Sequence, residues 1–444
     1  MNEKETSDAW NAAPRDQPTS SVTATISSDQ YHSPGQQQSD ASSSAPPDGG
    51  YGWVIVLTVF MVNGFTWGTV AAYSVYLGHY LRRNDYPQAS ATDFAFVGGF
   101  NFSLAVLIAP FVTYIARLYG PRAPMIVGVF LFSGAFLAAS FACQLWQLYL
   151  TQGIMVGLGV GLIYIPSIAI VSQWFSEKRS LANGICAAGS GIGGLATCFA
   201  TEAIIQKLDI SWALRITAIF VFVTNLIATV LLRSRNSEIL PSQKPFDVLL
   251  LRNYQFCLLL GWSFVMMFGY ITLMFSLPDF SRAIGLTSES SATTAALLNL
   301  GAAVGRPLIG FASDKFGRIE ITLYLTITCG FMCFGLWVPA STEGLLFTFS
   351  ILSGAILGIF WAAIGPLTAE IVGLKHLQSG LSLAWLTIVL PTTFAEVIAL
   401  RLRQFPQSRP YIYPQIFSAL SYITASLFLV ELLRAKRKQQ YGVD

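Results

Sequence analysis

From Trp53 onward the chain consists of long apolar runs separated by short polar connections. Each run can supply the roughly 20 helical residues needed to cross a hydrocarbon layer of about 30 Å. The runs are apolar on all sides and lack the alternating segments of about ten residues that membrane barrels show. The twelve runs cover roughly residues 53–80, 92–116, 124–143, 147–172, 180–204, 212–232, 254–280, 290–312, 320–340, 345–369, 379–400 and 411–433. This pattern predicts an all-α membrane protein with twelve transmembrane helices.

The segments outside these runs define the expected organisation. Residues 1–47 are rich in Ser, Gln, Pro, Asp and Thr, so we expect a disordered cytosolic tail without a signal peptide. Residues 233–253 are polar and basic, and they are the longest connection between runs. We interpret them as a cytosolic linker between two six-helix halves, 48–232 and 254–433. Residues 434–444 are expected to form a short basic cytosolic tail.

Composition and charge exclude an ordinary soluble enzyme. Charged residues make up 11% of the 444 residues, whereas soluble domains carry about 25%. If the N-terminal tail is cytosolic, 17 of the 26 Lys and Arg residues fall on the cytosolic side and 8 on the opposite side. This bias predicts that both termini are cytosolic. The net charge of +3 is small, and the basic residues form no nucleic-acid footprint.

The two halves repeat weakly in sequence. Pro166 and Leu181 have counterparts in Pro366 and Leu381, both at an offset of 200. A second match, at an offset of 197, relates the segment after Pro110 to the end of the eighth run. Such a repeat is typical of transporters that rock two bundles against each other. The alternative is chance similarity between apolar segments.

A loop motif, Gly310-Phe-Ala-Ser-Asp-Lys-Phe-Gly-Arg318, ends the eighth run. It resembles the G-x-x-x-D-R/K-x-G-R/K loop of the major facilitator superfamily. We expect Asp314 to pair with a basic group or a helix N-terminus across the bundle, and together with Arg318 to gate access. The alternative is a plain positively charged turn. The first half has Arg117 where the second half has Asp314, so it lacks the acidic residue of this motif.

Two further segments resemble the two signatures of the monocarboxylate porter family within that superfamily. One is Asp48-Gly-Gly-Tyr-Gly-Trp53, and the other runs from Trp174 to Ser190. They depart from the family pattern at Tyr51, where Trp or Phe is usual, and at Trp174, where Tyr is usual. The resemblance covers about residues 48–435 and is closer to fungal members than to animal ones.

This resemblance implies a major facilitator fold and a secondary transporter for a small organic, carboxylated metabolite. In the first signature, Asp48 is expected to cap the first helix. In the second signature, Lys178 and Arg179 are expected to take part in gating. We place the protein in a multi-pass membrane location, with the plasma membrane favoured over the vacuole.

Arg306 is the unusual charge inside a span. It lies about fourteen residues into the eighth run, between Gly305 and Pro307. A charge at such a depth costs at least ~2.5–3.5 kcal/mol and normally faces a cavity or a partner. The family resemblance implies a substrate-binding arginine at this Arg-Pro, and a guanidinium can contact a carboxylate with two hydrogen bonds. The alternative is that Arg306 extends toward a cytosolic surface about 10 Å away.

Two residues that are thought to couple proton and lactate transport in relatives are absent here. Lactate carriers of this family have an aspartate one turn before the arginine and a lysine in the first helix. Here those positions fall on Ala302 and on the lysine-free segment 64–72. The departures argue against proton-coupled lactate transport and leave open whether a proton is co-transported. Glu202 and Glu396 are the remaining acidic candidates, but both lie near the outer end of a run, which favours an interfacial position over a role in proton relay.

Several other mid-membrane side chains are candidates for lining a substrate site. Asn299 and Asn63 are costly in lipid and should face a cavity or another helix. Trp67, Tyr164 and Trp361 would suit a flat, partly apolar substrate, or they could simply fill the core. Glycines recur at every fourth position in the fourth and fifth runs, which allows close packing or a sliding seam.

The sequence suggests no cofactor, no metal site and no catalytic residues. It has no phosphate-binding loop, and its three histidines are too scattered for a zinc site. The expected partners are a small organic solute and the lipid bilayer. Two alternatives to a metabolite carrier remain at this point: a membrane solute sensor that transports nothing, and an exporter of a larger secondary metabolite.

Overall fold

The computed structural model describes residues 46–83, 86–242, 244–404 and 409–441. The expected tail at 1–47 lies almost entirely outside the described residues. The described residues belong to one compact unit. They form helices and contain no strand, which confirms the all-α prediction.

The helices of the first half are α2 (Tyr51–Phe65), α3 (Trp67–Ala71), α4 (Tyr73–Arg83), α5 (Ala91–Leu107), α6 (Ala109–Tyr119), α7 (Arg122–Ala139), α8 (Leu145–Leu148), the π-helix η1 (Tyr149–Met155), α9 (Val156–Trp174), α10 (Arg179–Lys207) and α11 (Ile210–Leu231). The linker carries α12 (Asn236–Ile239) and the 3-10 helix η2 (Val248–Arg252). The second half contains α13 (Tyr254–Ala283), α14 (Ser288–Phe316), α15 (Arg318–Met332), the π-helix η3 (Cys333–Trp337), α16 (Glu343–Leu357), α17 (Ile359–Thr387), α18 (Val389–Leu402) and α19 (Ile412–Tyr441).

The described helices account for twelve membrane crossings. Ten helical stretches are long and apolar enough to span a bilayer, and α5 with α6 forms an eleventh span bent by 42°. One of the ten stretches, Glu343–Leu402, is 60 residues long, or about 90 Å at ~1.5 Å per residue. Gly373 divides this stretch, because its φ of 74° is not helical. Each part then has the length of one span, which gives the twelve that the sequence predicts.

Helix starts follow local capping chemistry. Asn253 and Thr287 lie directly before α13 and α14, and their side-chain oxygens accept hydrogen bonds from the backbone amides three residues later. Ser90 and Asp93 form a reciprocal capping box at the start of α5. These caps supply partners for amides that have none inside the helix.

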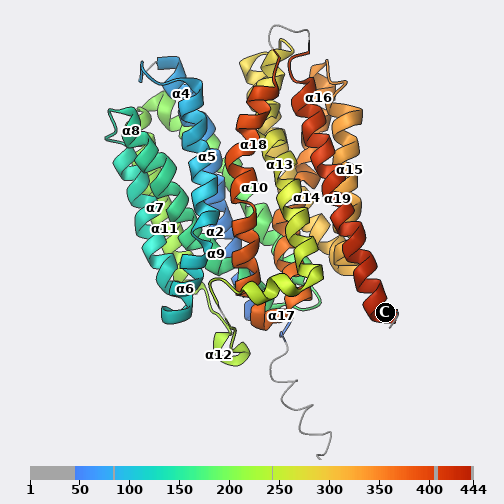
Figure 1. Ribbon diagram of the computed structural model, residues 1–444. Helices are drawn as coiled ribbons and strands as arrows, with labels where there is room; N and C mark the ends of the chain where they lie inside the picture. The colour runs from blue at the N-terminus through green and yellow to red at the C-terminus, as the bar shows by residue number, and fades with distance from the viewer. Residues whose placement is uncertain (1–45, 84–85, 243, 405–408, 442–444) are drawn as a thin grey trace, which may run out of the picture. The chain divides into compact units, whose positions relative to one another are not determined.

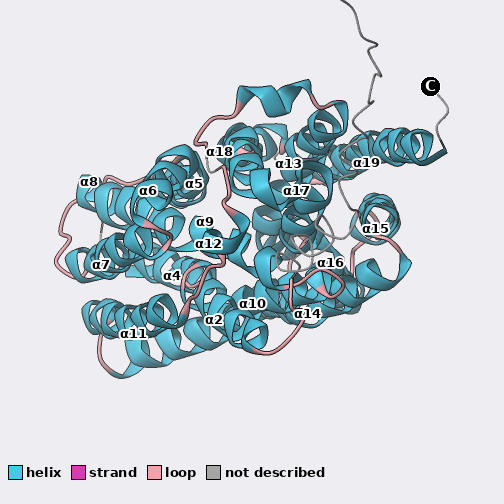
Figure 2. Cartoon of the chain, turned by 90° about the horizontal axis from the view of Figure 1, so that it is seen from below, coloured by secondary structure: helices cyan, strands magenta, loops and turns pink. Residues whose placement is uncertain are grey.

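The two halves meet along paired helices. The amino-terminal part of the chain (blue to green) and the carboxyl-terminal part (yellow to red) form two bundles in Figure 1. Between them α10 packs along α14, and α18 packs against α5. The view in Figure 2 shows α10 and α14 side by side, with α7 and α11 on one side and α15 and α19 on the other. This interface between halves is where the candidate site lies.

The described chain begins and ends at the same end of the bundle (Figure 1), which we call the terminal face. The loops at Ser176 and Gly317 and the break at Gly373 belong to this end, because Asp48 and Arg318 both bond to Ser176 and Arg318 pairs with Glu370. The loop at Gly120 lies there too, because Arg122 and Tyr51 both bond to the end of α11. We call the opposite end the far face. The last helix, α19, continues through Tyr441. The segment expected to be a tail from residue 434 is therefore helical as far as that residue.

Candidate functional site

Seven aromatic rings from both halves pack together at the interface of the halves. This central aromatic cluster consists of Trp67, Phe102, Tyr164, Tyr270, Phe360, Trp361 and Trp385. The first three belong to α3, α5 and α9, and the other four to α13 and α17. All seven side chains are buried. The cluster therefore fills the centre of the protein, where its rings make contacts between the two halves.

Trp361 is the ring that joins the halves most directly. Its centroid lies 5.5 Å from that of Trp67 in the first half, and it stacks on Trp385 at 5.7 Å. Tyr164 lies 5.7 Å from Trp67 and 5.8 Å from Trp385. Such separations are typical of favourable aromatic pairs. The structure thus brings together three of the predicted liners, Trp67, Tyr164 and Trp361.

Arg306 lies beside this cluster and points into protein rather than lipid. Only 7% of the side chain is exposed. Its Nη1 atom donates to the carbonyl of Ala187 at 2.6 Å and to Oγ of Ser190 at 2.5 Å, both in α10. Tyr164 and Tyr270 are within electrostatic range of the guanidinium. The alternative of an arginine that extends to the surface is therefore wrong.

The guanidinium of Arg306 has no carboxylate partner among the described residues. Its Nε atom is buried and without a hydrogen-bond partner in that part of the chain. A buried charge that is satisfied only by neutral acceptors is unusual, because desolvation of the charge is not offset by an opposite charge. The charge of Arg306 is therefore not balanced by an opposite charge in this part of the chain.

Glycines make the space for this arginine. A Cβ atom at Gly358, between α16 and α17, would lie 2.9 Å from Nη2 of Arg306 and 3.0 Å from its Cζ atom. A Cβ atom at Gly184 in α10 would collide with the carbonyl oxygen of Arg306. The absence of a side chain at Gly358 therefore leaves room for the guanidinium, and its absence at Gly184 lets α10 approach the backbone of α14.

The two asparagines lie elsewhere. Asn299 is on the side of α14 that meets α10, where its Oδ1 atom would be 3.7 Å from a Cβ atom at Gly194. Asn63 is buried in α2, one turn before Trp67, and its Nδ2 atom donates to the carbonyl of Val59 at 3.0 Å. Both amides also bond to their own helices. No hydrogen bond joins either amide to Arg306 in the part of the chain that the structure describes.

At the terminal face, Asp314 binds the start of a helix in the other half. Its carboxylate accepts hydrogen bonds from the backbone amides of Ser180 at 3.0 Å and Leu181 at 2.7 Å, in the first turn of α10. Arg318 donates to Asp314 at 3.1 Å and to the carbonyl of Ser176 at 2.7 Å. The predicted contact with a helix N-terminus across the bundle is thus present.

This latch extends to two residues that the sequence analysis did not single out. Glu370 in α17 lies 3.7 Å from Arg318. The ammonium of Lys436, in the last helix, forms an ion pair with the same carboxylate. Both side chains of the second pair are partly exposed, and such pairs contribute about 0–1 kcal/mol each. The network joins α14, α15, α17 and α19 at one end of the protein.

Asp48 does not cap the first helix, and that prediction was wrong. Gly50 occupies the cap position without a side-chain bond. The carboxylate of Asp48 instead accepts three backbone amides of the loop before α10, from Ser176 at 2.8 Å, Glu177 at 3.0 Å and Lys178 at 3.3 Å. The two signature segments therefore bind each other.

The basic pair of the second signature divides between two environments. The side chain of Lys178 is exposed, and its backbone amide provides the contact to Asp48. Arg179 is buried, and its Nε atom donates to the carbonyl of Phe175 at 2.9 Å. Arg179 thus fixes the turn before α10.

The first half has no copy of the Asp314 latch. Arg117 is exposed, and residues 380 and 381, which match 180 and 181 in sequence, lie inside α17. The backbone amides of these two residues bond within that helix, so they are not available to an acidic side chain. A side-chain hydrogen bond of 3.2 Å between Gln378 and Thr113 joins the halves at this position instead.

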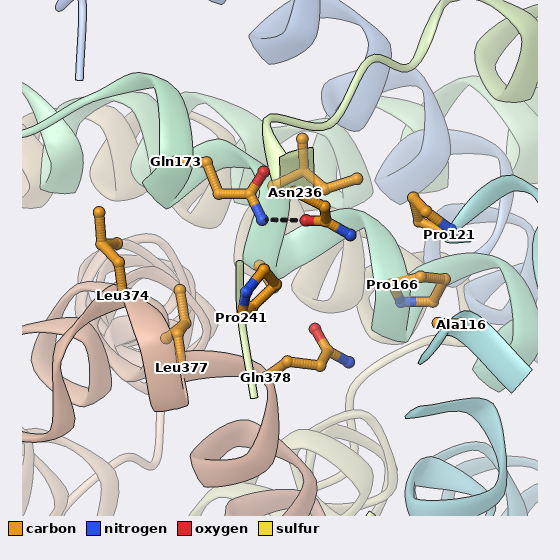
Figure 3. Close-up of a pocket in the computed structure, with 11 residues that line it drawn as sticks. Ala116, Pro121, Pro166, Gln173, Asn236, Pro241, Leu374, Leu377 and Gln378 are labelled. Atoms are coloured by element: carbon orange, nitrogen blue, oxygen red, sulfur yellow. Dashed lines mark hydrogen bonds between the residues drawn. The ribbon is translucent and has the colours of Figure 1, made fainter. Parts of the chain in front are cut away.

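Two cavities lie away from the aromatic cluster. One of about 10 Å³, room for one water, is lined by Pro166, Gln173 and Gln378 near the terminal face, and Figure 3 shows Gln173 bonded to Asn236 beside it. A larger one of about 220 Å³ lies at the far face, lined by Tyr80, Tyr86 and residues of α7 and α11. Neither contains a predicted site residue.

Some functional candidates could not be found from the sequence. Phe102, Phe360, Ser190 and Gly358 complete the surroundings of Arg306 and the cluster, yet each is an ordinary residue in an apolar run. An arginine inside an apolar run indicates a site, but the sequence does not reveal which helices face it. Only packing provides that information.

Comparison with known proteins supports the fold. Residues 53–395 match the family model described as Major Facilitator Superfamily. The chain is 33% identical over 387 residues to "Probable transporter MCH2" of Saccharomyces cerevisiae, covering 86% of this chain and 82% of that protein. It is 27% identical over 364 residues to "Fujikurins efflux protein" of Gibberella fujikuroi, covering 80% of this chain and 78% of that protein.

Solved structures of low sequence identity share the architecture. The proton:xylose symporter XylE, bound to 6-bromo-6-deoxy-D-glucose, superposes with a TM-score of 0.69 at 14% identity. That match covers 86% of this chain and 95% of the symporter. The E. coli fucose:proton symporter FucP superposes with a TM-score of 0.60 at 13% identity, covering 84% and 97%.

Proposed function

The chain belongs to the Major Facilitator Superfamily, and we propose that this transporter moves a small organic, carboxylated metabolite by alternating access. The observation that carries the proposal is the buried guanidinium of Arg306, which has no carboxylate partner among the described residues. A substrate carboxylate would supply the missing negative charge. Arg306 lies at the interface between halves, where a rocking motion would expose it to each side in turn.

The latch at the terminal face supports a two-state cycle. Asp314 and Arg318 reach across to α10, so these bonds must break before the terminal face can open. We propose that this face is cytosolic, because 17 of the 26 basic residues lie on that side of the predicted topology. The state described here would then be closed to the cytosol. The plasma membrane is the location we propose.

Proton coupling is a separate part of the proposal. Ala302, which stands one turn before Arg306, cannot take up a proton, so a proton carrier must lie elsewhere. Glu396 in α18 is our candidate, because its Oε2 atom is buried and accepts no hydrogen bond from the described residues. Arg403 and Asp279 are within electrostatic range of it. Glu202, by contrast, accepts a hydrogen bond from Gln206 at 3.0 Å.

The second candidate function is export of a larger metabolite. "Fujikurins efflux protein" and "Agnestins efflux protein AgnL12" are named for export, which favours an exporter of a larger secondary metabolite as the second candidate. A non-transporting sensor has no such support among the relatives. Because the relatives are transporters, we also propose that the protein is not an enzyme.

Purified protein in liposomes tests the anchor. We expect uptake of a carboxylate from a broad panel, with Arg306→Ala lowering its transport efficiency about 10- to 100-fold because a charge-assisted contact is lost. Arg306→Lys should recover only part of the activity, since Lys cannot bond in the same bidentate way. Arg434→Ala is the control, because Arg434 is exposed. Equal transport by wild type and Arg306→Ala would refute the anchor role.

A further inference from the structure

We propose that the substrate of this carrier is an aromatic carboxylate with a hydrogen-bond acceptor on its ring edge, and that the central aromatic cluster binds that ring. The inference rests on the proposed function, because it places the substrate carboxylate at Arg306. It adds a second recognition element, which the arginine alone does not imply.

The first observation is a pair of unused donors. The indole nitrogens of Trp67 and Trp385 are buried and have no acceptor among the described residues. The side chain of Trp67 is 9% exposed and that of Trp385 is fully buried. Buried N–H groups nearly always have a partner, because leaving one unpaired forfeits the hydrogen bond it made to water. Two unpaired indoles in one cluster therefore point to a missing acceptor.

The indoles of Trp67 and Trp385 contact the same two rings. Both pack against Tyr164, with centroid distances of 5.7 Å for Trp67 and 5.8 Å for Trp385. Both also pack against Trp361, at 5.5 Å and 5.7 Å. Trp67 belongs to the first half and Trp385 to the second. One ligand between the halves could accept from both.

The guanidinium adds a third donor to this region. Nε of Arg306 is buried without a partner, and Tyr164 is within electrostatic range of the same side chain. The donors without an acceptor are thus one N–H of the Arg306 cation and two neutral indole N–H groups. A ligand that satisfies them has a carboxylate at one end and a neutral oxygen at the other.

The rings explain why the body of the ligand should be aromatic. Four of the seven rings make contacts across the interface: Trp361 with Trp67 and Tyr164, and Trp385 with Tyr164. Separation of the halves therefore uncovers apolar ring faces. A short aliphatic acid covers little of that surface. A flat ring can replace each lost ring contact with another of the same geometry. In the structure described here the rings of the cluster cover one another, and a substrate ring would replace some of these contacts.

The experiment compares three acids in the same liposome assay. Cyclohexanecarboxylate and benzoate have the same carbon count, but only benzoate is flat and aromatic, and 4-acetylbenzoate adds a carbonyl acceptor at the opposite edge. We expect transport efficiency to rise in the order cyclohexanecarboxylate, benzoate, 4-acetylbenzoate. Trp67→Phe and Trp385→Phe keep an aromatic ring and remove the N–H donor. Each should reduce the advantage of 4-acetylbenzoate over benzoate by about 3- to 10-fold.

A matched control separates this role from packing. Trp337 is also buried with an unpartnered indole nitrogen, but it packs between Phe280 and Phe349 outside the cluster. Trp337→Phe should leave the ratios among the three acids unchanged. The order of transport efficiencies for the three acids is measured on the wild-type protein, so it remains informative even where a substitution impairs folding.

The outcomes distinguish the two proposals. Equal transport of all three acids, or Arg306-dependent transport of other carboxylates but of none of these three, would overturn the aromatic inference and leave the proposed function intact. Unchanged ratios in both tryptophan variants would remove the role of the N–H donors. Transport of the aromatic acids that persists in Arg306→Ala would instead overturn the charge anchor and support the ring site alone.

Discussion

The Oδ2 atom of Asp314 accepts a hydrogen bond of 2.7 Å from the backbone amide of Leu181, which lies 133 positions away in the other half of the chain. The first amides of a helix have no partner inside that helix, and they carry a partial positive charge. Arg318 of the same half also bonds to this carboxylate, but the bonds from the helix start exist only while α14 and α10 stay together. The hydrogen bond between these two residues therefore holds the two halves together at the terminal face.

Replacing Asp314 with Asn should favour opening of the terminal face. The substitution removes the negative charge beside the helix start and costs the closed state about 1–2 kcal/mol, a shift of about 5- to 30-fold in the ratio of states. Spin labels on the exposed residues Arg117 and Lys375, in a variant without native cysteines, would report a larger population of long distances.

The control for Asp314→Asn is Asp209→Asn. Asp209 also accepts a backbone amide at a helix start, from Trp212 at 2.7 Å, but it lies within one half. This variant should lower thermal stability without changing the label distances. Identical distance distributions for Asp314→Asn and wild type would contradict a gating role for the acid.

Gly358→Ala should impair transport without unfolding the protein. The new methyl group would lie within about 3 Å of the Arg306 guanidinium, and overpacking of this kind costs about 1–3 kcal/mol. We expect transport efficiency to fall about 10-fold because the guanidinium is displaced. Gly134→Ala, at a helical glycine with open space around it, should behave like wild type. Full activity in Gly358→Ala would show that the position of Arg306 is not critical.

Gly184→Ala distinguishes a sliding seam from simple close packing between α10 and α14. The methyl group would collide with the carbonyl of Arg306, so we expect a stability loss of about 1–3 kcal/mol in a thermal unfolding assay. A sliding seam further predicts slower turnover per folded molecule, whereas packing alone predicts unchanged turnover. Gly99→Ala, which meets no atom within 4 Å, provides the baseline for both measurements.

Glu396→Gln should uncouple transport from a proton gradient. Glutamine is similar in shape but cannot take up or release a proton, so an acidic exterior should no longer accelerate uptake, while exchange of labelled for unlabelled substrate continues. The groups that face this site are Arg403 and Asp279, together with Tyr411, which bonds to both. Glu431→Gln alters an exposed acid paired with Arg434 and should keep the gradient effect. A gradient effect that survives in Glu396→Gln would exclude this residue as the proton carrier.

The sequence by itself determined the features that depend on local chemistry. Twelve apolar runs follow from the cost of placing polar backbone and side chains in lipid, and the exceptional charge of Arg306 is visible within one run. The loop motif from Gly310 to Arg318 also identified Asp314 as a contact across the bundle. Each of these signals is contained in a short stretch of residues.

Tertiary structure alone decided which side chains meet. A helix that is apolar on all sides gives no preferred face, so hydropathy places Trp67 and Trp385 in the membrane without revealing that they share one cluster. Asp48 was misassigned for a related reason: its partners at 176–178 are distant in sequence, and the bend that brings them together is not encoded beside it. Contacts between distant segments arise from packing the whole bundle, and they decide what the site can bind.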